Sequence, residues 1–287
     1  MGYKDPDKLR AYKKDYYETN KAREKAKKKE YYEKNKEQKN EIDAKHREDR
    51  KQHAYNSITN GEIIDKKKWD IWCNNTIKHN ATTNGHPYSD DFTNDIIFDM
   101  MVKGCFYCGD TIAMTIDRKD SKLGHTQDNC VGSCQGCNKS KGAADISTFV
   151  RKAYYRVRGE YYDDDINIWY IYKERPRMRG YKEKAKKKEV PFELSKEDFD
   201  VLTKSECAYC NRRPDKWFGI DRVVPTLGYI IGNVVPCCCD CNTDKFEDDV
   251  DTMSARNERI VFRVIAGELI IDDCEKVILH RALTKPE

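Results

Sequence analysis

The stretch "IDRKDSKLGHTQDNCVGSCQGCNKSKG", residues 116–142, is the most informative part of the sequence, because the chain repeats its pattern as "IDRVVPTLGYIIGNVVPCCCDCNTDKF" at 220–246. From Asp117 to Lys141 the second copy follows the first at a constant offset of 104 residues, without a gap. Upstream, "CFYC" matches "CAYC", and the only insertion between this cysteine pair and the aspartate is two residues long. A register kept over this length indicates an internal repeat.

Each copy carries its cysteines as CxxC followed by a second CxxC. Four thiolates with this spacing suit a tetrahedral zinc ion, because each CxxC turn can aim both sulfurs at one metal. The alternative is eight buried or redox cysteines, but the spacing and the duplication favour zinc. A closed four-cysteine site leaves no open coordination position, so we expect two structural Zn²⁺ that stabilise a small core and do no chemistry. The predicted ligands are Cys105, Cys108, Cys134 and Cys137, then Cys207, Cys210, Cys238 and Cys241.

The remaining cysteines fall outside this pattern. In "PCCCDC" the alignment of the two copies selects Cys238 as the ligand. We assign the others to packing: Cys73, Cys130, Cys237, Cys239 and Cys274.

Composition restricts the class of protein. Charged residues make up 36% of the 287 and hydrophobic ones 38%, so the core is small for the length. Net charge is only +4, yet residues 1–60 hold 18 Lys+Arg against 12 Asp+Glu, and residues 151–190 hold 13 against 7. Basic stretches with many aromatics are typical of proteins that bind polyanions, although either stretch alone also fits a solvated charged helix.

The sequence predicts an intracellular protein. No apolar run approaches the roughly 20 residues that span a bilayer. The N-terminus "MGYKDPDKLRAYKKDYY" lacks the apolar centre of a signal peptide. We therefore expect no membrane partner and no secretion, but a location in the cytoplasm of a bacterial host or a virus-infected cell. Under reducing conditions thirteen cysteines favour metal binding over disulfides.

These features predict an α+β fold of two tandem zinc-bound ββα units with a charged helical N-terminal extension. In each unit we expect a Ser/Thr-capped helix, two short strands and a helix that begins at the second CxxC. The end of the connector, "RPRMRGYKEKAKKK", is expected to be mobile. The predicted segments are a DNA-contacting extension (1–60), a linker (61–90), the first unit (91–160), a basic and aromatic connector (161–192), and the second unit with a C-terminal extension (193–287).

A second set of polar residues recurs in both copies, and a zinc ribbon needs none of them. An Asp on a strand and an Asn on the following helix can supply two oxygen ligands to Mg²⁺. An adjacent Arg can pair with a phosphate. The set comprises Asp117, Arg118, Asn129 and Asn138, then Asp221, Arg222, Asn233 and Asn242.

At these residues the chain resembles the HNH (ββα-metal, or His-Me finger) endonucleases, over about residues 91–150 and 193–250. The resemblance implies cleavage of phosphodiesters with a divalent metal, Mg²⁺ or Mn²⁺. It implies that Asp117 and Asn138, and likewise Asp221 and Asn242, hold that metal. Asn129 and Asn233 would brace the loop after the first strand.

The chain departs from this family at the general base. The family's His directly follows the Asp, but here Arg118 and Arg222 stand in its place. In one branch of the family a Tyr seven residues after the Arg reaches the cleavage site; that position is Tyr229 in the second copy and His125 in the first. Because His titrates near pH 6.5 and Tyr near 10, the two copies are interpreted as unequal active sites. The alternative is that His125 is a surface loop residue that replaces a Tyr without consequence.

The resulting hypothesis is a sequence-specific double-strand endonuclease of restriction or homing type. Two active sites in one chain would form a monomeric pseudo-dimer with internal two-fold symmetry that cuts both strands of DNA. DNA contacts would come from the N-terminal helical region and from Arg175, Arg177, Arg179, Lys182 and Lys184. The alternatives are an inactive zinc-ribbon DNA-binding protein, such as a viral packaging protein, and a nickase with one live site.

Overall fold

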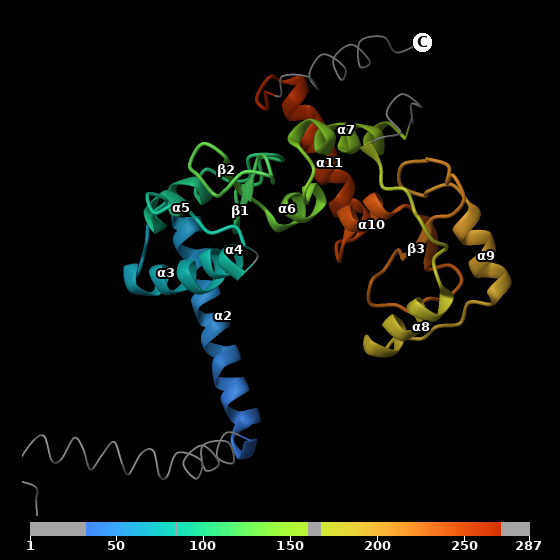
Figure 1. Cartoon of the computed structure of the whole chain (residues 1–287), viewed down its shortest axis with the longest axis horizontal. Helices are drawn as coiled ribbons and strands as arrows, with labels where there is room; N and C mark the ends of the chain where they lie inside the picture. Colours follow the sequence, from blue (N-terminus) through green and yellow to red (C-terminus); the bar gives the residue numbers. More distant parts are fainter. Residues whose placement is uncertain (1–32, 84, 160–167, 271–287) are drawn as a thin grey trace, which may run out of the picture. The chain divides into compact units, whose positions relative to one another are not determined.

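The computed structural model describes residues 33–83, 85–159 and 168–270 of the chain. The chain divides into two compact units, Met1–His53 and Ala54–Glu287. Figure 1 shows the described helices and strands in sequence colours. It is an α+β protein with two separate two-stranded antiparallel sheets among its described residues, as the sequence predicts. No helix in these ranges is long and apolar enough to cross a membrane.

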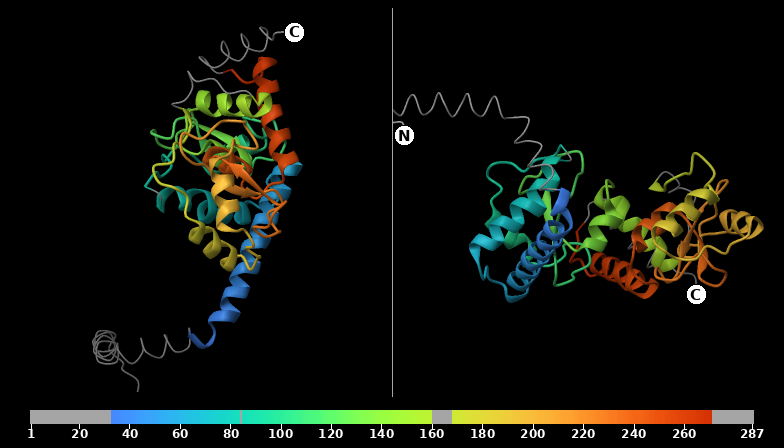
Figure 2. Two further views of the ribbon diagram at one scale, coloured as in Figure 1. Left: turned by 90° about the vertical axis from the view of Figure 1, so that its right-hand side faces the viewer. Right: turned by 90° about the horizontal axis from the view of Figure 1, so that it is seen from below.

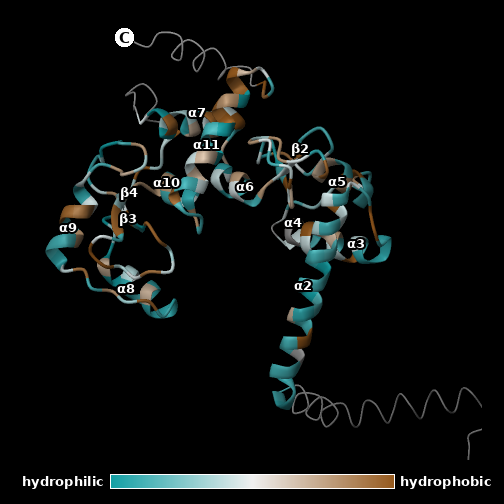
Figure 3. Cartoon of the chain, turned by 180° about the vertical axis from the view of Figure 1, so that it is seen from behind, coloured by the Kyte–Doolittle hydropathy of each residue, from teal (hydrophilic) through white to brown (hydrophobic). Residues whose placement is uncertain are grey.

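The helix α2 (Lys36–Asn60) carries the described part of the charged extension. Its sequence is rich in Lys, Glu and Arg, which favour helix, and it has no continuous apolar face (Figure 3). Near its end Ala54 and Ile58 are buried in the core of the second unit. Residues 1–32, the rest of the predicted extension, lie outside the described residues.

The first hairpin and its helices follow the expected order. Helix α5 (Asn94–Met101) is capped by the Thr93 side chain. Strand β1 (Thr115–Arg118) then pairs with β2 (Cys130–Ser133), and Asp117 faces Val131 in the register. Helix α6 (Gln135–Lys141) begins at the second CxxC, and α7 (Ile146–Arg158) follows it with Asp145 as its cap.

The second hairpin repeats this order. Helix α9 (Lys196–Lys204) begins with a capping box of Ser195 and Asp198. Strand β3 (Gly219–Arg222) pairs with β4 (Val234–Cys237), which places Asp221 opposite Val235. Helices α10 (Cys239–Lys245) and α11 (Val250–Ile265) complete the unit.

Residues 61–90, predicted as a linker, are instead mostly helical. They form α3 (Lys66–Trp72), the π-helix η1 (Cys73–Lys78) and α4 (His79–Thr83). Trp69 and Trp72 are buried there in one core with Phe98 and Ile116. The segment is therefore packed against the first hairpin unit, because its aromatic residues supply apolar surface that the short hairpin lacks.

The basic end of the connector, predicted to be mobile, forms helix α8 (Met178–Lys187). Its Ala185 is buried in one cluster with Ile220 and Tyr229, and Tyr181 packs against this cluster. The lysines and arginines of this segment therefore belong to an amphipathic helix with one apolar face. Residues 160–167 lie outside the described residues.

Helices α4 and α8 occupy equivalent places, so the repeat begins earlier than the motif suggests. Each is followed by a residue with positive φ, Gly85 (76°) and Glu189 (54°). After each of these residues comes a three-residue segment, "HPY" or "VPF". Its last residue forms a β-bridge with the loop between the two strands of the hairpin, Tyr88 with His125 and Phe192 with Tyr229. From here "first repeat" means residues 73–159 and "second repeat" residues 178–270.

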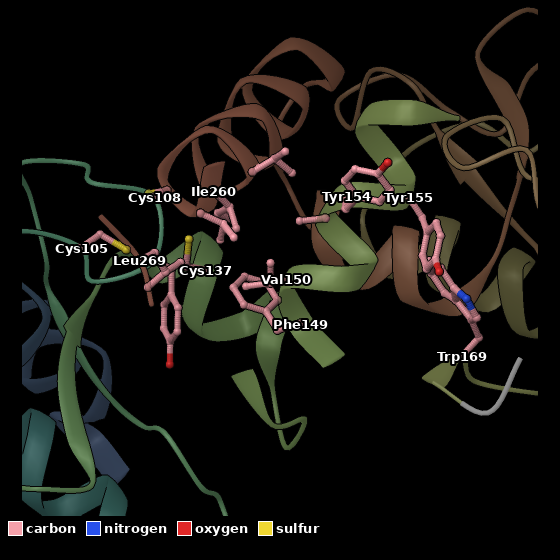
Figure 4. Packing of buried hydrophobic residues seen from close by; sticks show 14 residues of the cluster. Cys105, Cys108, Cys137, Phe149, Val150, Tyr154, Tyr155, Trp169, Ile260 and Leu269 are labelled. Carbon is pink, nitrogen blue, oxygen red and sulfur yellow. The ribbon is translucent and has the colours of Figure 1, made fainter. Parts of the chain in front are cut away.

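Equivalent helices of the two repeats contact each other. Helix α6 packs against α10, and α7 lies beside α11 (Figures 1 and 2). One apolar cluster joins Phe149 and Val150 of α7 to Ile260 and Val264 of α11 (Figure 4). The two repeats thus share a core.

Candidate functional site

The cysteine sulfurs gather in the two sets that the sequence predicts. In each set the four Sγ atoms lie within 4.8 Å of one another. Cys108 and Cys134 are 3.8 Å apart at sulfur, and Cys210 and Cys238 are 3.9 Å apart. Sulfurs bound tetrahedrally at about 2.3 Å from zinc stand about 3.8 Å apart, so both sets fit a structural zinc ion. "First cluster" and "second cluster" below mean these two sets.

Local backbone geometry supports the clusters. Cys134 caps α6 by accepting a hydrogen bond from the Cys137 amide, and Cys238 caps α10 in the same way from Cys241. Hydrogen bonds from neighbouring thiols, first of all Cys108, hold the pKa of Cys105 well below its usual value. Hydrogen bonds with Cys105 and Cys108 raise the pKa of Cys134 and Cys137, so a metal that binds all four sulfurs has to displace protons from the cluster.

The cysteines assigned to packing behave accordingly where the structure describes them. Cys73 and Cys237 are fully buried, and burial raises the pKa of the Cys130 thiol to about 12. Cys237 donates to the Cys238 carbonyl, as Ser133 does to the Cys134 carbonyl at the equivalent place. Cys239 is partly exposed at the start of α10. Cys274 lies outside the described residues.

Asp117 is buried on β1 and is held by two side chains. The Tyr107 hydroxyl donates to its Oδ2 at 2.5 Å, and Lys141 Nζ lies 3.1 Å from the same oxygen. Asp117 is 6% exposed and the Lys141 side chain is fully buried. Burial raises the pKa of Asp117, while the Lys141 charge acts in the opposite direction.

The second repeat reproduces this arrangement. The Tyr209 hydroxyl donates to Asp221 Oδ2 at 2.8 Å, and Lys245 Nζ lies 3.1 Å from that oxygen. Each lysine also donates to the carbonyl of the arginine after the aspartate, at 2.8 Å for Lys141 and 2.9 Å for Lys245. Across the described ranges, no side chain donates a hydrogen bond to Oδ1 of either aspartate.

Asn138 lies against the same strand as Asp117. Its amide nitrogen donates to Thr115 Oγ1 at 3.0 Å and to the Ile116 carbonyl at 3.4 Å, which leaves the amide oxygen for another partner. Asn242 occupies the equivalent place on α10, but Gly219 replaces Thr115 there. A Cβ at Gly219 would stand 2.7 Å from the Tyr181 hydroxyl and 2.9 Å from that of Tyr172.

The loop between the strands is held by the asparagines at its end. Asn129 Oδ1 accepts from the Asp120 amide at 2.9 Å, and its Nδ2 donates to the carbonyls of Asp120 and Gly124. Asn233 makes the same three bonds with Val224 and Gly228. These bonds close both loops on the hairpin and fix where the residue after the glycine stands.

The arginines after the aspartates bind the same loops. Arg118 donates to the Leu123 carbonyl at 2.8 Å, and Arg222 donates to that of Leu227 at 3.3 Å. A guanidinium has five donors, so each arginine keeps others for a ligand.

His125 is 9% exposed and therefore not a surface loop residue. Its ring stacks on Tyr88 with centroids 4.3 Å apart, and its Nδ1 lies 2.6 Å from the His86 carbonyl oxygen. Since a carbonyl only accepts, the neutral ring carries its proton on Nδ1 and leaves Nε2 as an acceptor. Burial lowers the pKa of His125, so the ring is neutral at pH 7.

Tyr229 fills the equivalent place and is 7% exposed. Its ring packs on Phe192 and Tyr181, and the Arg222 guanidinium lies 5.0 Å from the ring centroid. Burial raises the pKa of Tyr229, so its hydroxyl keeps its proton at neutral pH.

The five predicted DNA-contacting residues lie on or beside α8. Arg175 pairs with Asp200, Arg177 with Glu174 at 3.2 Å, and Arg179 with Glu183 at 2.8 Å. Lys182 and Lys184 lie over the rings of Phe192 and Tyr181 at 5.5 and 5.3 Å. Exposed ion pairs contribute little, so these arginines can exchange a carboxylate for a phosphate at small cost.

Sequence reasoning missed four residues of the site: Tyr107, Tyr209, Lys141 and Lys245. The signal was present, because both copies have Tyr directly before the second cysteine of the first CxxC and Lys three residues after the helix Asn. The repeated Tyr and Lys do not stand out in the sequence, because both residue types are common at protein surfaces and neither ligates zinc.

Fold and site together define an α+β protein with two four-cysteine clusters, each beside a β-hairpin and a helix. No protein-family model and no solved structure matches the chain. The chain is 34% identical over 173 residues to an uncharacterized protein of Acanthamoeba polyphaga mimivirus. This match covers 55% of the chain and 32% of the viral protein, so the chain spans about a third of that relative's length.

Proposed function

We propose that this protein is a metal-dependent DNA endonuclease with one site in each repeat. The observation that carries the proposal is duplicated: each repeat has a buried Asp on a strand and an Asn on the next helix, beside a cysteine cluster that needs neither.

The oxygens of the first repeat fit a hard divalent cation such as Mg²⁺ or Mn²⁺. Asp117 Oδ1 receives no side-chain donor within the described residues, and the hydrogen bonds of Asn138 use only its amide nitrogen. Such a cation takes oxygen ligands and completes its shell with water and phosphate oxygens. When bound, it would stabilise the negative charge that develops on the phosphate.

The chain's own residues supply the remaining roles. His125 is neutral and presents Nε2, so it can accept a proton from the attacking water. Arg118, fixed through Leu123, can pair with a neighbouring phosphate oxygen. The loop that carries both residues is held by Asn129.

Charge and symmetry support duplex DNA as the proposed substrate. The lysines and arginines of the α8 segment suit a phosphate backbone. Contacts between equivalent helices, α6 with α10 and α7 with α11, are the pattern of a two-fold dimer interface. A single chain would thus present two cleavage sites to the two strands of a duplex.

A nickase with one live site is the second candidate, and specific differences between the repeats favour it. His125 of the first repeat is replaced by Tyr229, whose proton is retained at neutral pH. Thr115, which orients Asn138, is replaced by Gly219. Both differences favour the first repeat as the faster site.

The test is cleavage of plasmid DNA by zinc-loaded protein, with Mg²⁺ or Mn²⁺ added from zero. We expect cleavage that requires the added metal and is lost when Asp117 and Asp221 are both changed to Ala. If DNA is retarded in a gel but stays intact under every metal, the proposal is wrong and the chain is a DNA-binding protein.

A further inference from the structure

We propose that Tyr107 and Lys141, with Tyr209 and Lys245 in the second repeat, are positioning residues that aim Oδ1 of Asp117 and Asp221 at the divalent cation. These four residues are called the Oδ2 clamp. This inference rests on the proposed function, and it assigns a role to residues that neither zinc binding nor the catalytic scheme uses.

The clamp acts on one oxygen of each carboxylate. Tyr107 and Lys141 both bind Oδ2 of Asp117, and Tyr209 and Lys245 both bind Oδ2 of Asp221. Two donors on one oxygen fix the rotation of the carboxylate and leave the other oxygen for a metal. Hydrogen bonds to a ligating carboxylate orient it in this way in metal sites.

The clamp also connects the aspartates to the cysteine clusters. Tyr107 lies between Cys105 and Cys108 in the sequence. Lys141 is the last residue of α6, the helix that Cys134 caps and that contains Cys137. The position of both donors is therefore set by the first cluster. The structural zinc would act on cleavage from a distance, by holding the residues that hold Asp117.

A lysine is a costly residue to bury, and its retention in both repeats needs a reason. Both ammonium groups are fully inaccessible to solvent, and each has an aspartate oxygen and a backbone carbonyl as partners. The hydrogen bond from the lysine to the arginine carbonyl would be enough to attach α6 to β1 or α10 to β3, and an uncharged side chain could donate it. The second contact, 3.1 Å from Oδ2 in each repeat, places the ammonium group beside the carboxylate that is proposed to hold the metal.

The experiment measures Mn²⁺ binding rather than cleavage. Zinc-loaded full-length protein is titrated with Mn²⁺, and free Mn²⁺ is followed by electron paramagnetic resonance, with and without duplex DNA. For wild type we expect two Mn²⁺ per chain. We expect Tyr107→Phe to weaken one of the two sites about tenfold and Tyr209→Phe to weaken the other. Lys141→Met should weaken the same site as Tyr107→Phe.

The matched control is Tyr155→Phe. This change also removes a hydroxyl from the buried cluster that contains Tyr107, but the Tyr155 hydroxyl is not the one that donates to Asp117. Zinc content is measured for every variant and should stay at two per chain, which separates positioning from unfolding.

Unchanged Mn²⁺ affinity in Tyr107→Phe overturns the inference while leaving the proposed function intact. Tighter binding in Lys141→Met also overturns it, because Lys141 would then compete with the metal. If wild type binds no Mn²⁺ with or without DNA, the proposed metal site itself is wrong.

Discussion

At the scale of single residues, the two repeats differ most at one position. His125 and Tyr229 stand in equivalent loops, each next to the residue that follows a proline, Tyr88 or Phe192. Both are buried, but burial pushes their pKa values apart, down for His125 and up for Tyr229. Only His125 can accept a proton near neutral pH.

This difference predicts a pH profile for the first site alone. In an Asp221→Ala protein the cleavage rate should stay level from pH 8 to 6.5 and fall only below 6.5, because burial lowers the pKa of His125 from that value. His125→Gln should reduce the rate about 100-fold or more at pH 7. Initial nicking rates across this range check it; an unchanged rate in His125→Gln would show that the ring is not the base.

The buried Asp–Lys pair predicts a pattern in stability. Lys141→Met leaves Asp117 buried without its cation and should cost about 3–5 kcal/mol of unfolding free energy. The double variant Asp117→Asn with Lys141→Met removes both charges and should recover most of that loss. Denaturant unfolding of wild type, Lys141→Met, Asp117→Asn and the double variant measures this, and additive costs of the two single variants would argue against a direct pairing.

At the scale of elements, the sequence predicted the hairpins, the capped helices and the cysteine sets, because each leaves a local pattern of spacing. It did not predict α4 and α8 as parts of the repeat. Ala81 and Ala185 are the equivalent buried positions, but the sequences around them differ, "HNATT" against "YKEKAKK". Only the fold shows their equivalence, in backbone bonds such as His86 N to Ala81 O and Val190 N to Ala185 O.

The loop after these helices predicts a matched pair of substitutions. Glu189 has φ of 54° and Gly85 has φ of 76° in the equivalent place. Side chains strain this conformation by about 1–2 kcal/mol, so Glu189→Gly should raise the unfolding free energy by about 1 kcal/mol.

The reverse change, Gly85→Ala, should lower the unfolding free energy by a similar amount. No atom lies within 4 Å of the added Cβ, so backbone strain alone decides its effect. Thermal or denaturant unfolding checks both variants, and a destabilised Glu189→Gly would show that the Glu189 side chain contributes more than its strain costs.

At the scale of the whole molecule, each repeat donates hydrogen bonds to residues at or beside the other repeat's cluster. Arg156 of α7 donates to Cys241 Sγ at 3.5 Å and to the Asp240 carbonyl at 3.2 Å. Arg263 of α11 donates to the carbonyls of Cys105 and Phe106 at 3.2 and 2.8 Å. These bonds and the shared core of α7 and α11 join the two repeats, so we expect the repeats to unfold together.

This sharing predicts that the loss of one zinc destabilises both repeats. Cys238→Ser removes a ligand of the second cluster, and structural zinc contributes about 10–16 kcal/mol, at least as much as the usual unfolding free energy of a domain. Helix α7 should then lose protection from hydrogen exchange, and the first cluster should release its zinc to a weaker chelator. The control Cys239→Ser, a neighbour outside the cluster, should keep two zinc ions. Full protection of α7 in Cys238→Ser would show that the repeats are independent.

The form of the cut plasmid shows whether one chain has two DNA-cleaving sites. Supercoiled plasmid is treated with wild type, Asp117→Ala and Asp221→Ala at equal zinc content and a fixed Mg²⁺ concentration. We expect linear product from wild type and only open circles from each single variant, with Asp221→Ala the faster of the two. If both single variants still linearise the plasmid in one event, the two repeats do not cut one strand each, and the proposed function of the two sites is wrong.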